Sequence, residues 1–465
     1  MELKKYRRKR EIPIGWKEIK LGDVFRTSSG ATPLTTELSY YEGGNIPWIN
    51  SGELASPYIY STSNYITQKG FDNSSTEIYP KGTILVAMYG ATAGKASMLK
   101  ITACTNQAIC AILPNDDYCP EFIKYNIDTL YEHLVGLSSG SARDNLSQAG
   151  LKELKLVLPK TKKEQENLIA VLSLLDSKIE LNKQINDNLE AMAKQLYDYW
   201  FVQFDFPNEK GKPYKSSGGV MVWNENLKRE IPQGWVVEKM GKCTNVLLGG
   251  TPDTNDNSLW GNGYNWLNSG EVAEFPILKS EKNITPKGLE KSATVLAPKG
   301  SVTLSITRHL RPSILCIDAC INQSVVAILE NDKVSKEYIY PLLNRDIPRL
   351  MSLRTGAQQP HINKETVEAI NVVLPPANIM GAYINIAESI YNAIFNNAKE
   401  VEELTKQRDE LLPLLMNSQA SVNYHLSVLF ITKIMLYYKE TNINFGYERN
   451  NNTKRFRWNE SGFDR

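Results

Sequence analysis

The chain has 465 residues, 42% hydrophobic and 22% charged, a composition typical of a globular protein in which each half can bury its own core. The net charge of +2 excludes an overall basic surface, so any surface that attracts a polyanion must be local. Six cysteines without a Cys-x-x-Cys pair or a set of histidines indicate reduced thiols in a cytoplasmic protein. Cys104 and Cys320 occupy corresponding positions in the two halves, which favours packing over chemistry.

The chain opens with a basic arm, residues 1–10, that contains the run KKYRRKR. No apolar stretch follows this run, so it is not a secretory signal. Two interpretations of the arm remain open, a phosphate-binding segment and a solvated tail.

Residue 11 begins a sequence that the chain repeats: EIPIGW at 11–16 returns as EIPQGW at 230–235. The landmarks that follow each copy in the same order are ATP (31–33) and GTP (250–252), WINSGE (48–53) and WLNSGE (266–271), ITQKG (66–70) and ITPKG (284–288), PKGTI (80–84) and PKGSV (298–302), and VLP (157–159 and 373–375). The offset between equivalent residues changes only from 219 to 216. The chain is therefore a tandem duplication of a whole domain, since a solenoid repeat would be much shorter.

The two copies predict mixed α/β domains at 11–159 and 230–375, which diverge almost completely between the landmarks. Short apolar runs separated by Gly, Pro, Ser and Asn predict buried strands. These runs are TILVAM (83–88), QAICAIL (107–113), SVTLSI (301–306) and QSVVAIL (323–329), with short helices expected around 120–134 and 336–344.

Two loops of the first domain carry residues suited to a nucleic acid. The segment 89–95, YGATAGK, lacks the GxxxxGK[ST] pattern of a nucleotide-binding loop, so a close backbone approach to a DNA phosphate competes with a plain structural turn. A second loop spans 138–147. The candidates are Tyr89, Thr92 and Lys95 in the first loop and Arg143 and Asn145 in the second.

The corresponding loops of the second domain are 307–312, TRHLRP, and 353–363, LRTGAQQPHIN. Arginine reads guanine and glutamine reads adenine, so these residue types suit insertion into a DNA groove. Solvated surface loops are the alternative. The candidates are Arg308, His309, Arg311, Arg354, Gln358 and Gln359.

A long helix follows each domain, at 160–203 and 376–417, and a linker at 204–229 joins the first helix to the second domain. Apolar residues recur every seven positions in both helices, a pattern typical of a coiled coil. The seam residues are Leu168, Leu175, Asn182, Leu189 and Leu196 in the first helix and Ile390, Asn397, Leu404 and Leu411 in the second. We expect two pseudo-symmetric domains whose helices pair antiparallel, with Asn182 meeting Asn397. Helices of about 36–40 residues span roughly 55–60 Å and would hold the domains apart.

These landmarks, together with MYGATAGKASML at 88–99 and LLPLLMN ending at 417, resemble the specificity (S) subunit of type I restriction-modification systems. The resemblance implies a non-catalytic, DNA-binding subunit with two target recognition domains, each of which reads one half of a bipartite, asymmetric site. It also implies that the helices dock two methyltransferase (M) subunits, which carry S-adenosylmethionine, and that a restriction and translocase (R) subunit joins for cleavage. No membrane partner is expected. The tail at 418–465 departs from the family and suggests an altered or extended reading frame.

Two rival functions make different demands on the sequence. A DNA adenine methyltransferase needs a [DN]PP[YF] tetrapeptide, and the nearest match, PPAN at 375–378, lacks both flanking residue types. A nuclease needs clustered carboxylates for metal, which do not stand out here. A structural adaptor with two partner-binding domains would not bind DNA at all, and salt-sensitive binding to a specific duplex would separate it from a recognition subunit.

Overall fold

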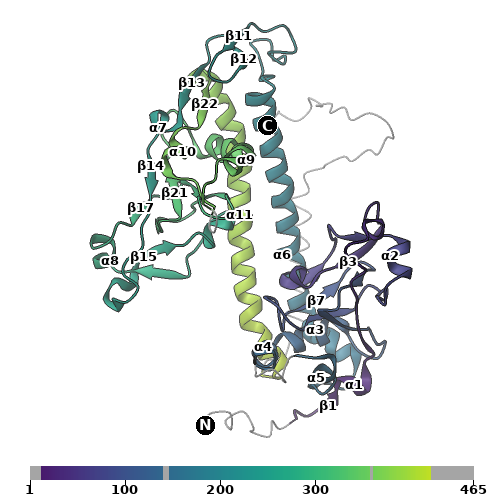
Figure 1. The fold of residues 1–465 in the computed structure, drawn as a ribbon. Coiled ribbons are helices and arrows are strands. Elements are labelled where there is room, and N and C mark those ends of the chain that lie inside the picture. The colour runs from purple at the N-terminus through teal and green to yellow at the C-terminus, as the bar shows by residue number, and fades with distance from the viewer. Residues whose placement is uncertain (1–11, 140–145, 357–359, 420–465) are drawn as a thin grey trace, which may run out of the picture. The chain divides into compact units, whose positions relative to one another are not determined.

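The computed structural model describes residues 12–139, 146–356 and 360–419. The chain divides into two compact units, one formed by residues 1–173 with 411–465 and the other by residues 174–410. Each unit contains one globular α/β body together with parts of two long helices (Figure 1).

The body of the first unit is built on a five-stranded sheet with the order β2-β9-β6-β7-β4 and a three-stranded sheet with the order β5-β3-β8. Its first and last strands, β1 and β10, form a separate antiparallel pair. The strands are β1 (Trp16–Lys20), β2 (Thr27–Ser29), β3 (Ile46–Ile49), β4 (Tyr58–Ile59), β5 (Tyr65–Ile66), β6 (Ile84–Ala87), β7 (Ala96–Leu99), β8 (Cys104–Thr105), β9 (Ile109–Ile112) and β10 (Lys155–Pro159). The short helices are α1 (Leu21–Val24), α2 (Gln68–Asp72), α3 (Pro120–Asp128), α4 (Tyr131–Ser139) and α5 (Gln148–Lys152).

The second unit repeats this arrangement. The sheet β14-β21-β18-β19 corresponds to β2-β9-β6-β7, the order β16-β15-β20 corresponds to β5-β3-β8, and the pair β13–β22 corresponds to β1–β10. The strands are β13 (Val236–Lys239), β14 (Val246–Leu248), β15 (Trp260–Leu267), β16 (Lys282–Ile284), β17 (Val295–Ala297), β18 (Val302–Ser305), β19 (Pro312–Ile314), β20 (Ala319–Ile321), β21 (Val325–Ile328) and β22 (Asn371–Leu374). The helices are α7 (Met240–Cys243), α8 (Pro286–Glu290), α9 (Lys336–Ser352) and α10 (Lys364–Glu368). The hairpin β11 (Met221–Asn224) and β12 (Arg229–Pro232) precedes this body.

The four predicted strands are confirmed as β6, β9, β18 and β21, and all their residues are buried. Helices are also found at both predicted places, with different bounds. The segment predicted around 120–134 forms two helices, α3 and α4, with a break at Thr129 and Leu130. Helix α9 continues past residue 344 to Ser352, although Pro341 and Pro348 lie within it, because its buried face continues to Leu350.

The two long helices are α6 (Lys162–Tyr197) and α11 (Ala377–Met416). Thr161 and Glu164 start α6 with a capping box, in which each side chain bonds the backbone N–H of the other residue, at 3.3 and 3.1 Å. A wide helical turn, Asp198–Val202, extends α6 at its end. No helix in the described ranges combines the length and hydropathy that a membrane span needs.

Within the second unit the helices run antiparallel. Asn182 of α6 bonds Glu400, and Asn186, four residues further on, bonds Asn397, three residues back along α11. The predicted antiparallel pairing is therefore confirmed, and Figure 1 shows the two helices side by side.

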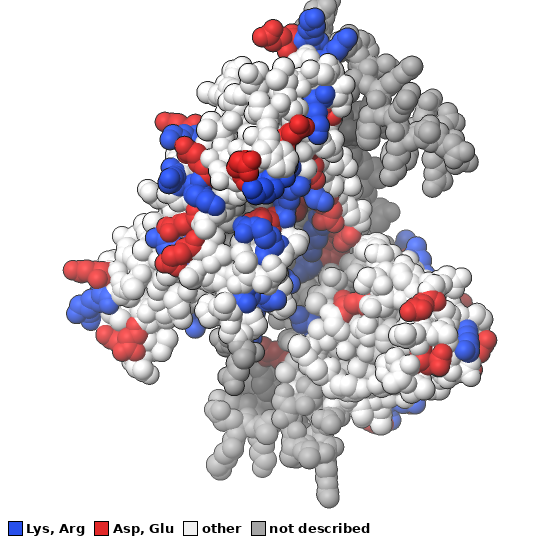
Figure 2. All heavy atoms as spheres, turned by 45° about the horizontal axis from the view of Figure 1, so that its top comes forward, with Lys and Arg blue, Asp and Glu red and all other residues white. Residues whose placement is uncertain are grey.

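Charges of both signs lie on the face shown in Figure 2, with Lys and Arg side chains gathered over the second unit and acidic side chains among them. This distribution agrees with the net charge of +2. Attraction of a polyanion therefore depends on where individual basic side chains stand, and not on an overall positive field.

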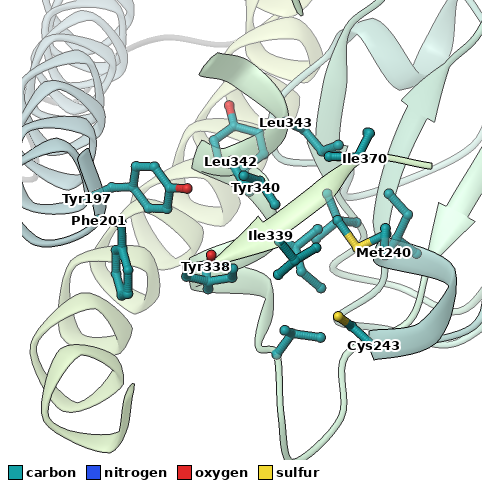
Figure 3. Packing of buried hydrophobic residues seen from close by; sticks show 14 of the residues in the cluster. Tyr197, Phe201, Met240, Cys243, Tyr338, Ile339, Tyr340, Leu342, Leu343 and Ile370 are labelled. Carbon is teal, nitrogen blue, oxygen red and sulfur yellow. The ribbon is translucent and has the colours of Figure 1, made fainter. Parts of the chain in front are cut away.

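The core of the second unit joins the end of α6 to the globular body. Figure 3 shows Tyr197 and Phe201 directed toward Tyr338 of α9. The rings of Phe201 and Tyr338 meet edge to face at 4.8 Å, and the Tyr338 hydroxyl donates to the carbonyl of Val373 at 2.7 Å. Because these rings are buried, the long helix and the body form one packed structure.

Candidate nucleic-acid interface

The most exposed basic residues among the candidates lie on the loop between β18 and β19. These strands pair antiparallel, with Leu304 opposite Pro312, so the loop closes a hairpin. Arg308, His309 and Arg311 are exposed, whereas Leu310 is 4% exposed and anchors the loop in the core. The hairpin therefore presents three basic or potentially basic side chains on a fixed base.

The structure brings the second candidate loop of this domain against the first. Thr307 forms a β-bridge with His361, and the backbone N–H of Arg308 donates to the carbonyl of Pro360 at 3.0 Å. The guanidinium of Arg354 donates from Nη1 to the carbonyl of Arg308 at 2.6 Å. The two loops are separate in the sequence, but these contacts join them into one surface. Gln358 and Gln359 lie outside the described residues.

His361 is an exposed member of this surface that the sequence analysis quoted but did not select. Its backbone exchanges two hydrogen bonds of 2.9 Å with Thr355, which closes the loop on itself. Its signal in the sequence is its place in the candidate loop 353–363.

The exposed arginines of this hairpin differ from four other arginines in having no carboxylate partner among the described residues. Arg26, Arg345, Arg349 and Arg408 each form an ion pair with a carboxylate. In the described part of the chain no carboxylate pairs with Arg308, His309 or Arg311. Guanidinium groups without a carboxylate partner keep their donors available for phosphate or base edges.

The equivalent loop of the first domain, between β6 and β7, has a different chemistry. Tyr89 is 47% exposed and Lys95 is partly buried. Thr92 is buried, and its hydroxyl donates to the carbonyl of Ser51 at 2.7 Å, so this side chain holds the loop in place. Gly94 lies against α4, where an added Cβ would stand 3.2 Å from Leu134. Arg143 and Asn145 lie outside the described residues.

The repeated phrases hold the backbone in both domains. Trp48 donates from its indole nitrogen to the carbonyl of Ala31 at 3.0 Å, and Trp266 donates to Gly250 at 3.2 Å. The threonines of ATP and GTP bond the glutamines of a further matched pair of phrases, NQA (106–108) and NQS (322–324), as the pairs Thr32–Gln107 and Thr251–Gln323. These contacts explain why the phrases recur in both copies.

The matched cysteines also serve packing. Cys104 and Cys320 are fully buried, and burial raises the pKa of each thiol to about 11. Both thiols therefore stay protonated at neutral pH and are poor nucleophiles and metal ligands. Within the described ranges no group of His, Cys, Asp and Glu side chains is arranged to hold a metal.

The helix seam carries a polar ladder in place of the predicted asparagine pair. Asn182 donates to Glu400 at 2.8 Å, and Asn397 donates to Asn186 at 3.0 Å. Asn186 also donates to the carbonyl of Ile394 at 3.1 Å. The predicted contact between Asn182 and Asn397 was wrong, because equivalence in the duplication does not specify which residues face each other across the pair.

The other predicted seam residues lie on the packed sides of the helices. In the second unit Leu175 is buried, and Leu189, Leu196, Ile390 and Leu404 are partly buried. In the first unit Leu168 and Leu411 pack against the core. Further along the seam, Asp176, which is 5% exposed, bonds Arg408 at 3.1 Å, and Lys178 pairs with Glu400.

The helix pair of the second unit has two further surfaces. One is a groove of about 1060 Å³ between α6, α11 and the segment 274–279, where seven carboxylates outnumber three lysines. This excess of negative charge makes the groove unsuitable for DNA. The other surface is apolar: Leu181, Ile185, Met192 and Ile386 are 36, 38, 47 and 47% exposed. Their spacing in α6 places Leu181, Ile185 and Met192 on one face of the helix.

Comparison with protein-family models matches residues 13–191 and 232–406 to the type I restriction modification DNA specificity domain. The chain is 28% identical over 425 residues to the MjaIX specificity subunit of a type I restriction enzyme from Methanocaldococcus jannaschii, covering 89% of this chain and 95% of that relative. It is 21% identical to the HindI specificity subunit from Haemophilus influenzae, covering 87% and 99%. A solved structure of a type I restriction-modification S subunit from M. genitalium matches 87% of this chain and 96% of that chain, with a TM-score of 0.51 and 16% identity, which shows a shared fold.

Proposed function

Because the chain belongs to the type I restriction modification DNA specificity family, we propose that each of its two domains reads one half of a bipartite, asymmetric DNA site. The chain is a non-catalytic specificity subunit of a type I restriction-modification system, with two target-recognition domains. We take these domains as residues 11–159 and 230–375. Its task is therefore recognition, while bond making and breaking belong to other subunits.

One observation carries this proposal: the two domains share a framework and differ in the exposed loop at the same place. The loop of the first domain presents Tyr89 and Lys95, and the loop of the second presents Arg308, His309 and Arg311. Side chains that reach base edges specify sequence, whereas contacts to phosphates set the register. Two different loops on equal frameworks would thus read two different half-sites.

We propose that two methyltransferase subunits dock on the helices and that a restriction and translocase subunit completes the complex. Leu181, Ile185 and Met192, which are exposed on one face of α6, support this assignment, because large exposed apolar patches mark interaction sites. S-adenosylmethionine would be bound by the methyltransferase subunits, and we assign no cofactor to this chain. The helix pair would set the distance between the half-sites.

Exchange of residues 11–159 for the domain of another family member tests the proposal. The chimera should change one half of the methylated motif completely and leave the other half unchanged, as measured by methylation-sensitive sequencing of a host that carries the complex. An exchange of 230–375 is the matched control and should alter only the other half. An adaptor that does not bind DNA predicts no change in the motif, and a change of both halves by one exchange would contradict separate reading.

A further inference from the structure

The loop between β6 and β7 and the equivalent loop between β18 and β19 both need a residue with positive φ at the same position. The two domains have different residues there. In the first domain the strands pair with Ile84 opposite Met98, and in the second with Val302 opposite Ile314. Gly90 and Arg308 stand at the same position after the first strand of each pair. Both have positive φ, 87° for the glycine and 56° for the arginine.

An arginine is an unusual choice for this position. Left-handed backbone is open to glycine, whereas a side chain with a Cβ is disfavoured there. Strained residues of this kind persist where the surroundings fix them, and they concentrate at functional sites. The second domain therefore accepts strain in order to carry a long cationic side chain where the first domain has none.

The contacts that fix this strained residue come from the neighbouring loop. Pro360 accepts the backbone N–H of Arg308, and Arg354 donates from Nη1 to the Arg308 carbonyl. Arg354 also donates from Nε to the carbonyl of Met351 at 3.1 Å, which ties it to the end of α9. Leu310 anchors the other side of the turn in the core. The peptide groups on both sides of the Arg308 Cα are thus fixed.

Arg308 and Arg354 consequently differ in how many hydrogen-bond donors they can offer to DNA. Arg354 is partly buried, and two of its five N–H donors are bonded to backbone carbonyls, so fewer of its donors are available for a base edge. Arg308 is exposed and pairs with no carboxylate in the described part of the chain. A free guanidinium fork on a fixed turn is the group that pairs with O6 and N7 of guanine.

We propose that Arg308 reads a guanine edge in the major groove and that Arg354 is the positioning residue that fixes the turn from which Arg308 projects. This inference rests on the proposed function, and it gives different roles to two arginines that the sequence alone predicts only as DNA-binding candidates. The proposal also distinguishes Arg308 from Arg311, because Arg311 does not have a positive φ.

Arg308→Gly tests the first part, because stability and recognition should change in opposite senses. The full chain, assembled with its methyltransferase subunits, is measured for Tm and for binding to duplexes with every single base change in the site. We expect the Tm to stay equal or rise, since glycine accepts the left-handed backbone. Discrimination at one position of the second half-site should fall about 5-fold to 150-fold, the value of one bidentate contact.

Lys228 provides the matched control, since its φ is 51° and it lies in the β11–β12 turn, outside both loops. Lys228→Gly should affect Tm in the same sense and leave discrimination at every position unchanged. Equal weakening on all duplexes by Arg308→Gly would reduce Arg308 to a phosphate contact, and an unchanged discrimination profile would also overturn the proposal.

Arg354→Ala tests the positioning role. It should relax the same base position as Arg308→Gly, and the double variant should lose no more discrimination than Arg308→Gly alone, because both changes remove one contact. Arg354→Lys, which keeps one donor for the Arg308 carbonyl, should restore part of the loss. Relaxation of a different position by Arg354→Ala would make Arg354 a reader in its own right. If the unaltered complex prefers no sequence, the proposed function fails, and not the division of roles between the arginines.

Discussion

The repeated phrases are alike in the two domains, whereas the loops between them differ, and the two kinds of segment have different structural roles. Where the domains agree, the shared residues bond backbone: the indoles of Trp48 and Trp266 each hold the turn before them. Where they differ, the loops between β6 and β7 and between β18 and β19 present exposed side chains of different chemistry, such as Tyr89 and Arg308. The difference shows that duplication preserved the internal contacts of the framework and left the outward side chains free to change.

Two glycines of the framework should give the largest effect. An added Cβ would lie 2.0 Å from the Thr105 carbonyl oxygen at Gly30 and 2.1 Å from the Ile321 carbonyl oxygen at Gly249. Because backbone atoms would have to move, we expect Gly30→Ala and Gly249→Ala each to lower the free energy of unfolding by about 3 kcal/mol or more. Hydrogen exchange should locate each loss in its own domain.

Gly52, with no atom within 4 Å of an added Cβ, is the control, and Gly52→Ala should change stability little. A large loss in one domain with none in the other would break the comparison, because the two frameworks would then not be equivalent.

A smaller effect on stability is expected at the polar contact between the helices. Replacing both Asn186 and Asn397 by Leu removes a bonded polar pair and should keep stability or raise it by about 1 kcal/mol. The register should loosen, since polar seam residues specify it, and a slide of one heptad moves a helix about 10 Å. The spacer between the methylated half-sites should then vary. Asn392→Leu, at an exposed position, is the control and should leave the spacer unchanged, and a constant spacer in the double variant would refute the register role.

The smallest effect concerns a position where the helices do not match. Burial raises the pKa of Glu190 to about 7, with Asp187 adding to the shift, whereas the equivalent residue of α11 is Thr405. Since the folded state favours the neutral acid, Glu190 costs stability progressively as pH rises from about 4.5 to about 7. Glu190→Gln should match the unaltered chain in Tm at pH 4.5 and exceed it by no more than a few degrees above pH 7.

Asp187→Asn should make this difference smaller and let it level off at a lower pH, because it removes the second cause of the raised folded-state pKa of Glu190. A Tm difference that stays constant with pH would mean that Glu190 does not titrate in this range.

The strands were predictable because apolar runs such as 83–88 stand between turn residues, and the helices because their period is unbroken over long stretches. The contact between the loops around Arg308 and Arg354 was not, since it joins residues 46 positions apart through backbone carbonyls that have no sequence signature. The burial of Thr92 was equally hidden, because a glycine-rich phrase does not tell which side chains point inward. The sequence pattern was thus sufficient to select the candidate loops. The different roles proposed for residues within a loop depend on tertiary contacts that the sequence does not reveal.

The pairing of the first and last strands in each body has a genetic consequence. Strand β1 begins at the last residue of the phrase EIPIGW and pairs with β10, which ends with VLP. Strands β13, which follows EIPQGW, and β22 repeat this pairing. The two ends of each body therefore lie side by side, as is common for domains that tolerate insertion into another chain. Recombination between the DNA segments that encode these phrases would deliver a whole body with its closing strands intact. Two crossovers, one in each phrase, would exchange a whole domain. The protein that results would still fold and would recognise a new DNA sequence.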